Sequence, residues 1–405
     1  MPSPLNWRAC VLAAGLCLAT PLAQSQVQSQ SLGETLEQAW SNLPETAAFP
    51  ERLQALGAQL EAAKSWLAGS PALTLGHKTD RFDHAEGARE WELELSAPLP
   101  LPGQRERKQT LAEAERSEFE RSLALTKWRY AGELREAYWR LRLAEVERRL
   151  NQRKQRELAV LSADVKRRLQ AGDLANTDLN QALGAEQAAR ILALQADAGW
   201  QQAKREFAVL SGDTALPEGE ESPREGPALE QHPALLAALA QVDSARARLD
   251  ESLGDKRDNP ELALGLSRER DSVEEAYGNQ VSLRLRLPLG TDARNRPRVS
   301  AANAALAEAE AAAQSALRRL QGARDNARIE LQSSQQIAEL ATERAELARQ
   351  NSQWLNQAFA QGELDLPGRL RAESEKFESE LALARADLER ARAVSRLNQA
   401  SGVLP

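Results

Sequence analysis

Residues Asn279 to Gly290 read N-Q-V-S-L-R-L-R-L-P-L-G, and this stretch decides the fold. From Val281 to Leu287 every second residue is aliphatic, whereas the positions between them hold serine or arginine. A period of two residues is that of a β-strand whose faces meet different surroundings. After Gly290 the period changes, and from about Arg298 to Gln361 the sequence predicts one very long helix.

The same succession occurs once earlier in the chain. Glu90 to Leu101 also alternates, with aliphatic or aromatic residues on one face and acidic or small residues on the other. The chain then passes through Pro102 and Gly103 into a helical pattern that runs to about Gln170. Each long helix has roughly 65 to 70 residues, or about 100 Å at ~1.5 Å rise per residue. A strand that leads into a long helix, twice, is therefore the plan of this protein.

An internal repeat supports this plan. Ala171-Gly172-Asp173-Leu174 has a counterpart in Gln361-Gly362-Glu363-Leu364, 190 residues later. Each copy is expected to hold a leading helix, two strands, a long helix, a hinge turn at Gly172 or Gly362, and a shorter return helix. The expected strands are 72–80, 90–101, 261–268 and 279–289. The predicted division is a first module at 26–212, a Pro-, Gly- and Glu-rich linker at 213–231, and a second module at 232–405.

The composition favours long helices and excludes several functions. Aromatic residues make up 4% of the chain and charged residues 27%, with a net charge of −7 and interleaved signs. This profile is typical of coiled coils, and it offers no basic patch for nucleic acid. No phosphate-binding loop, H-E-x-x-H or nucleophile elbow is present, so no enzyme is expected. The first strand pair and its loop hold acids and histidines without the spacing of a metal site, so neither metal nor cofactor is predicted: His77, Asp80, Asp83, His84 and Glu86.

Residues 1–25 have the features of a secretory signal peptide. Arg8 supplies a positive charge, and Ala9 to Ala19 is an apolar core too short to span a bilayer. A small-x-small pattern predicts a mature start at Gln26. Acylation of Cys17 is the alternative, which Leu16 weakens because a small residue is wanted before a lipidated cysteine. Both cysteines lie in this segment, so the mature chain is expected to lack thiols.

The strands indicate a membrane. No later segment has ~18 consecutive apolar residues, so any membrane span must be made from strands. Strands of about ten residues with aliphatic side chains at every second position suit a lipid-facing barrel wall. The expected lipid face comprises Leu93, Leu95, Val281, Leu283, Leu285 and Leu287, and the expected water-filled lumen is lined by Glu92, Glu94, Arg284 and Arg286.

Four strands do not close a barrel, and an open sheet edge in lipid leaves unpaired backbone groups that cost several kcal/mol each. The chain is therefore expected to form a homotrimer with 12 strands in all. The predicted fold class is α+β, mostly α, with a long coiled-coil helical barrel beside a transmembrane β-barrel. The alternative is a non-pore periplasmic coiled-coil adaptor or scaffold, since alanine-rich heptad helices alone are more often structural.

Two eleven-residue motifs carry a family resemblance, namely Gly172 to Ala182 (G-D-L-A-N-T-D-L-N-Q-A) and Gly362 to Ala372 (G-E-L-D-L-P-G-R-L-R-A). With the duplicated modules and the signal peptide, the chain resembles the TolC-like outer-membrane efflux family over about 31–404. Its short length is more similar to the heavy-metal (CzcC-type) branch than to the multidrug branch.

The resemblance implies an outer-membrane channel subunit that extends into the periplasm. Such a channel belongs to a tripartite efflux or type I secretion system, and its partners are a periplasmic adaptor (membrane fusion) protein, an inner-membrane pump of the RND type and outer-membrane lipid. The glycine turns would lie at the periplasmic tip, where the pore closes and the adaptor docks.

The resemblance also implies a gate. Asp178 occupies the position of an aspartate that holds the tip closed, and a helix cap is the alternative role for this residue. The second motif departs from the family's acidic rings, because it carries Gly368 and Arg371 at those positions. A ring of three Arg369 or Arg371 side chains is expected to favour anions at the constriction.

Overall fold

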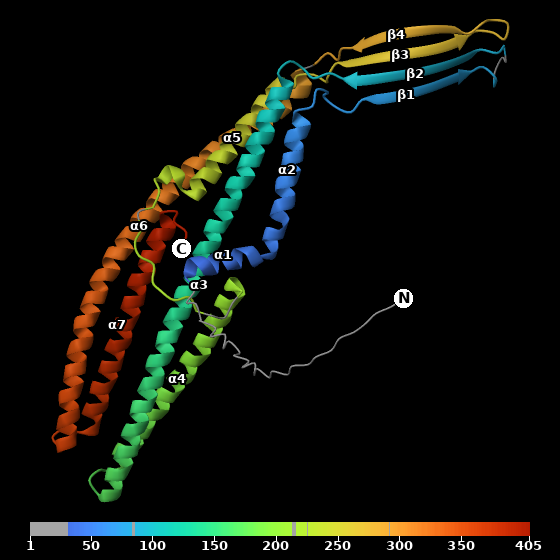
Figure 1. The fold of residues 1–405 in the computed structure, drawn as a ribbon. Coiled ribbons are helices and arrows are strands. Elements are labelled where there is room, and N and C mark those ends of the chain that lie inside the picture. The colour runs from blue at the N-terminus through green and yellow to red at the C-terminus, as the bar shows by residue number, and fades with distance from the viewer. Residues whose placement is uncertain (1–30, 83–85, 213–215, 225, 291) are drawn as a thin grey trace, which may run out of the picture.

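The computed structural model describes residues 31–82, 86–212, 216–224, 226–290 and 292–405. A long bundle of helices carries a four-stranded sheet at one end (Figure 1). The predicted signal peptide and Cys17 lie outside the described residues. The elements in chain order are α1 (Leu32–Asn42), the 3-10 helix η1 (Pro44–Ala48), α2 (Phe49–Ala63), β1 (Ala72–Thr79), β2 (Arg89–Pro98), α3 (Gln104–Ala171), α4 (Asn176–Ser211), the 3-10 helix η2 (Leu229–Gln231), α5 (Pro233–Gly254), β3 (Glu261–Arg270), β4 (Gly278–Arg286), α6 (Asp292–Gln361) and α7 (Leu366–Ala400).

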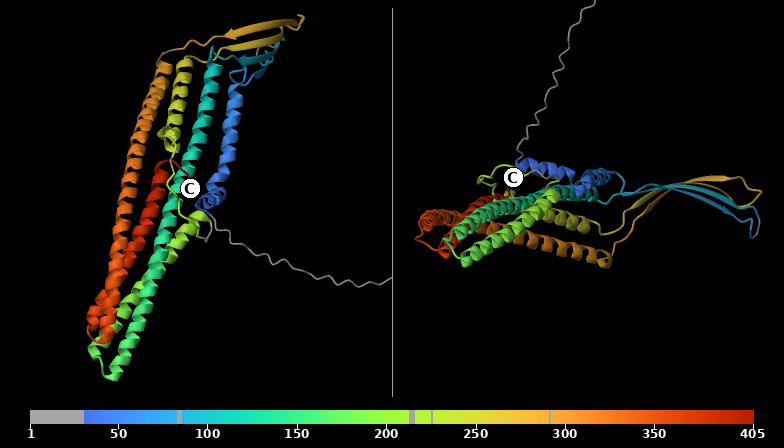
Figure 2. Two further views of the ribbon diagram at one scale, coloured as in Figure 1. Left: turned by 60° about the vertical axis from the view of Figure 1, so that its left-hand side comes forward. Right: turned by 90° about the horizontal axis from the view of Figure 1, so that it is seen from below.

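The sheet is antiparallel, with the order β1-β2-β3-β4. Its central pairing joins the two modules, because β2 of the first copy pairs with β3 of the second, with Leu95 opposite Leu264. The outer edges of β1 and β4 have no partner strand among the described residues. Figure 2 shows the sheet as a twisted ribbon that leaves the helical bundle at an angle.

Two strands end earlier than their alternation predicts. β2 ends at Pro98 instead of Leu101, and β4 ends at Arg286 instead of Leu289. Prolines follow closely in both places, and a proline removes the N–H that a ladder needs. Leu101 turns inward and is buried, and its N–H donates to Oε1 of Gln104 at 2.9 Å. Leu287, expected on the lipid face of the strand, therefore lies just beyond it and remains exposed.

The two long helices have 68 and 70 residues, and each ends at a glycine. Gly172 has φ 90° and Gly362 has φ 82°, a left-handed conformation that only glycine adopts without strain. The N–H of Asp173 donates to the carbonyl of Arg168 at 2.9 Å, and that of Glu363 donates to Ala358 at the same distance. These bonds satisfy the last helical carbonyls, so both turns reverse the chain identically.

The described residues of the predicted linker, 216–224 and 226–231, pack against the helices halfway along the bundle. Arg135 of α3 is 2% exposed and binds Glu221 of this segment through two bonds of 3.0 and 2.6 Å. It also donates to the carbonyl of Val403 at 2.9 Å and to the Gln399 side chain. Ser395 of α7 donates to the same Glu221 carboxylate. One buried guanidinium therefore ties the first module, the linker and the end of the second module together.

A buried histidine begins the second module. His232 is 1% exposed, and its Nδ1 accepts the N–H of Ala234 at 3.1 Å, capping α5. The Trp128 ring of α3 packs edge-on against it, with 4.8 Å between ring centroids. Burial lowers the pKa of His232 below its usual value. Its imidazole is therefore neutral and accepts the capping bond.

We expect Arg135→Ala to destabilise the protein far more than Arg140→Ala. Removing one partner of a buried ion pair costs about 3–5 kcal/mol, because the other charge stays buried and unpaired. Arg140 pairs with Glu206 in a bridge whose side chains are 55% and 43% exposed, and exposed pairs contribute only ~0–1 kcal/mol. The midpoint of urea-induced loss of helical circular dichroism measures both effects. Equal midpoints for the two variants would contradict the role given to Arg135.

Candidate functional site

One face of the sheet is continuously aliphatic. The register places Leu73, Leu95, Leu264 and Leu283 side by side across all four strands. The next row comprises Leu75, Leu93, Leu266 and Val281, and a third joins Ala97, Leu262 and Leu285. These leucines are exposed in the single chain, Leu283 at 73%. Exposed apolar surface in contiguous rows marks a membrane or protein contact.

The opposite face carries charges of both signs, placed together from the two modules. Arg284 on β4 forms an ion pair with Glu94 on β2 at 2.7 Å and approaches Glu92 at 3.8 Å. Arg286 lies 3.9 Å from Glu261, a residue that sequence reasoning did not single out. These predicted lumen residues therefore neutralise one another within one chain.

Small residues of β3 make this pairing possible. Gly265 lies between Glu94 and Ser282 in the ladder, and Ala263 lies opposite Arg284. A Cβ added at Gly265 would come within 2.4 Å of the Ser282 hydroxyl oxygen. The arginine side chain consequently reaches across β3 to β2. The sequence contains a signal for this arrangement, because the small residues alternate with leucines along β3.

Aromatic and cationic side chains mark both ends of the apolar face. At the loop end, the rings of His77 and Trp91 stack with centroids 4.0 Å apart. At the helix end, Arg105 lies over the exposed Trp66 ring, 4.6 Å from its centroid. Aromatic residues of this kind are enriched where a membrane protein crosses from hydrocarbon to water.

The two helical hairpins end at the same extremity of the molecule, far from the sheet (Figure 1). Their tips share one apolar cluster, in which Val165 of α3 packs with Phe359 of α6 and Leu366 of α7. Leu174 and Leu364, which follow the two glycines by two residues, pack against this cluster. The turns at Gly172 and Gly362 therefore lie close together within one chain.

The N-cap of α4 is Ala175, so Asp178 does not hold the N-cap position that was its alternative role. Its Oδ2 accepts the N–H of Ala175 at 3.0 Å, in the first turn of α4. A carboxylate at this end of a helix is also favoured by the helix dipole. No ion pair joins Asp178 to another residue in the described part of the chain.

Arg369, which is expected in a ring at the constriction, makes contacts within its own chain. Its Nε donates to Oδ1 of Asn356 at 2.8 Å, and its guanidinium lies 4.8 Å from the Phe359 ring centroid. Burial lowers the pKa of this guanidinium, although arginine stays charged. Arg371, two residues on, is exposed. The side chains point differently because residues two apart lie on different faces of a helix.

The sequence analysis did not identify a group of ion pairs that lies between the helices near the tips of the hairpins. Lys376 of α7 binds Glu373 at 2.7 Å and Glu157 of α3 at 3.0 Å. Glu380, 6% exposed, binds Arg349 at 2.9 Å and Arg153 at 3.3 Å. Two of these pairs, Lys376–Glu157 and Glu380–Arg153, bridge the two hairpins of one chain. The sequence contains a signal for this layer, because Lys376 and Glu380 lie four residues apart and therefore on the same face of α7.

The described residues hold neither a candidate metal site nor a helix that could span a membrane. They contain no group of three or more His, Cys, Asp or Glu residues placed to hold a metal ion. Asp83 and His84 lie outside the described part. No helix described here has the length and hydropathy of a membrane-spanning segment.

Comparisons with known proteins agree on the fold. Residues 226–403 match the family model of outer membrane efflux proteins. A structure of CusC superposes with a TM-score of 0.76 at 15% identity, covering 92% of each chain. VceC of Vibrio cholerae gives 0.73 at 16% identity, over 92% of this chain and 96% of that one. The CmeC channel of Campylobacter jejuni also gives 0.73, at 14% identity, over 99% and 94%.

No curated protein sequence matches. The family model covers the second module, and the solved channels share the fold of both modules, including the four-stranded sheet and the paired hairpins. The predicted fold is thereby confirmed, and the match over residues 226–403 to the outer membrane efflux proteins agrees with the predicted resemblance.

Proposed function

We propose that three copies of this chain form a channel that carries substrates from an inner-membrane pump across the periplasm and the outer membrane. The observation that carries this proposal is the sheet, which has one aliphatic face, one charged face and two open edges. Such a sheet is stable in lipid only when other copies pair with both edges and close the wall. A scaffold protein without a pore would not require a sheet with one aliphatic face, one charged face and two open edges.

The number of copies follows from the size of the barrel. Two copies would give eight strands, and a barrel of about 8 strands is just filled by its own side chains. Each copy contributes four strands, so three copies give 12 and leave a lumen for Glu92, Glu94, Arg284 and Arg286. A trimer is the smallest assembly of this sheet that conducts.

The helices support the same assembly. Helix α6 carries an exposed apolar stripe with spacings of eight, three, seven and seven residues, formed by Ile329, Ile337, Leu340, Leu347 and Trp354. Each of these side chains is between 55% and 67% exposed in the single chain. A stripe of near-heptad spacing requires a helix to pack against. In the trimer a neighbouring copy supplies it, and the long helices form the periplasmic barrel.

The proposed partners meet the end of the barrel farthest from the sheet. The tips at Gly172 and Gly362 extend toward the inner membrane, where an adaptor protein and a pump of the RND type, or a type I secretion machine, complete the path. The pump sets the substrate, and the heavy-metal branch stays a prediction. At the tip, Asp178, Arg369 and Arg371 remain the proposed gate residues, and Arg369 also joins α7 to α6 through Asn356.

The assembly is tested on α6. We expect Leu347→Glu to prevent trimer formation, because the new charge would be buried against a neighbouring copy. Gln353→Glu adds the same charge on another face of the same helix and is the matched control. Light scattering of the detergent-extracted protein measures the mass, and planar bilayers measure single-channel conductance. A wild-type protein that is a stable monomer, or a trimer without conductance, would disprove the proposed function.

The membrane face is tested on β4. Leu283→Arg should impair assembly in the outer membrane, since arginine at a lipid-facing midplane position costs about 2–4 kcal/mol. Arg286→Leu, on the charged face, should assemble normally. The amounts of heat-modifiable protein in outer-membrane fractions measure both. If both variants assembled equally, the assigned faces would be wrong.

The gate is tested by ion selectivity. Arg371→Glu reverses three charges in a trimer, so the reversal potential in a salt gradient should shift toward cation preference. Arg369→Gln removes a charge that packs inside one chain, so it should lower thermal stability with a smaller change in reversal potential. A larger shift for Arg369→Gln than for Arg371→Glu would show that the constriction is lined differently.

A further inference from the structure

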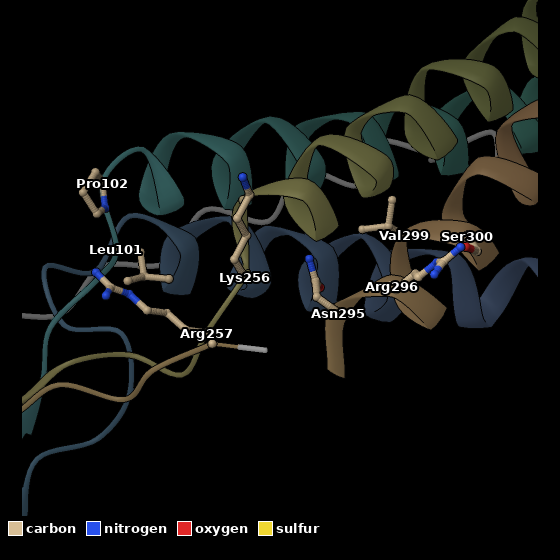
Figure 3. A pocket seen from close by; sticks show the side chains of 10 residues that line it. Leu101, Pro102, Lys256, Arg257, Asn295, Arg296, Val299 and Ser300 are labelled. Carbon is tan, nitrogen blue, oxygen red and sulfur yellow. The ribbon is translucent and has the colours of Figure 1, made fainter. Parts of the chain in front are cut away.

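A basic cavity lies where the sheet joins the helices. It has a volume of about 850 Å³ and lies between the loop after α5, the end of β2 and the first turns of α6. Figure 3 shows Lys256 and Arg257 on that loop, and Asn295 and Arg296 at the start of α6. No acidic residue is among the described residues that line the cavity, in a chain whose net charge is −7.

The cations of this cavity are not paired with any carboxylate among the described residues. Lys256, Arg257 and Arg296 are exposed, and none of them forms an ion pair with another described residue. The neighbouring acid Asp255 instead accepts a hydrogen bond from Nε2 of Gln104 at 2.8 Å. Arg296 lies near the N-terminus of α6, which begins at Asp292, and the positive end of the helix dipole there favours an anion.

Close contact between two loops builds the cavity. A Cβ added at Gly290 would lie 2.4 Å from the carbonyl oxygen of Lys256 and 3.1 Å from Cβ of Arg257. The β4–α6 connection therefore touches the α5–β3 connection, which places Lys256 and Arg257 in the same cavity as Arg296. Arg107 supports the rim, since its Nη2 donates to the carbonyl of Pro102 at 3.0 Å.

The cavity lies at the depth of lipid headgroups. The last aliphatic row of the sheet contains Leu262 and Leu285. Leu287 and Leu289 follow, 54% and 88% exposed, and Gly290 then lines the cavity. Apolar surface for acyl chains thus leads directly to unpaired cations, an arrangement that recognises an anionic lipid and not a free anion.

We propose that this cavity binds the phosphate headgroup of an anionic phospholipid in the periplasmic leaflet of the outer membrane. The inference rests on the proposed membrane location of the sheet. Lys256, Arg257 and Arg296 attract the phosphodiester, while Leu287 and Leu289 contact the upper acyl chain. The lipid fixes the depth at which each copy sits and holds the helical barrel upright beneath the sheet.

Native mass spectrometry of the detergent-extracted trimer tests this proposal, with phosphatidylglycerol as the probe and phosphatidylcholine of identical acyl chains as the neutral comparison. The triple variant K256Q/R257Q/R296Q should retain phosphatidylglycerol at least about tenfold less than wild type, given the contribution of each cation near an anionic surface. The control K166Q/R190Q/R205Q neutralises three exposed cations on α3 and α4 and should retain it normally.

The outcomes separate the two proposals. Equal retention by the triple variant, equal retention of phosphatidylcholine, or displacement of the lipid by millimolar inorganic phosphate would overturn the lipid site. Mass and single-channel conductance are recorded on the same preparations. A wild-type trimer that conducts but retains no phosphatidylglycerol overturns only this inference, whereas the absence of a conducting trimer overturns the proposed function as well.

Discussion

The structure depends on the unpaired backbone groups at the two edges of its sheet. β1 and β4 each present a row of N–H and C=O groups with no partner strand in the described chain. In water such an edge is a modest liability, but in hydrocarbon each unpaired group costs several kcal/mol. The edges therefore require other copies, and closure arranges the long helices in a ring below. Oligomerisation is a condition for this sheet to exist in a membrane.

Within one chain, ion pairs add to two apolar clusters, one around Leu134 and Phe207 and one at the tips of the hairpins. Arg135 with Glu221 fixes the middle of the bundle, and Lys376 with Glu157 and Glu373 fixes the region above the tip. Such pairs are specific in partner and distance, which holds two long hairpins in register where apolar contacts alone would allow them to slide.

Periodicity predicted the elements well because each signal has one physical cause. The strand at 279–289 alternates since its faces meet different surroundings, and the helices end at Gly172 and Gly362 because a left-handed residue is needed there. What the sequence does not indicate is which residues, distant along the chain, contact one another. Nothing near Arg135 identifies Glu221, 86 positions later, as its partner. Arg369 and Arg371 look equivalent in sequence, yet the packing of α7 against α6 leaves Arg369 half-buried and Arg371 exposed.

The pairing of β2 with β3 has a consequence for how the channel assembles. A chain with only one module would have two strands, and six separate bodies would have to meet before the same wall closed. Each association costs several kcal/mol or more in lost translational and rotational freedom. Covalent duplication cuts the encounters from five to two and so makes closure a lower-order reaction. Duplication also allows the two modules to differ in sequence, so that Glu94 of the first module pairs with Arg284 of the second.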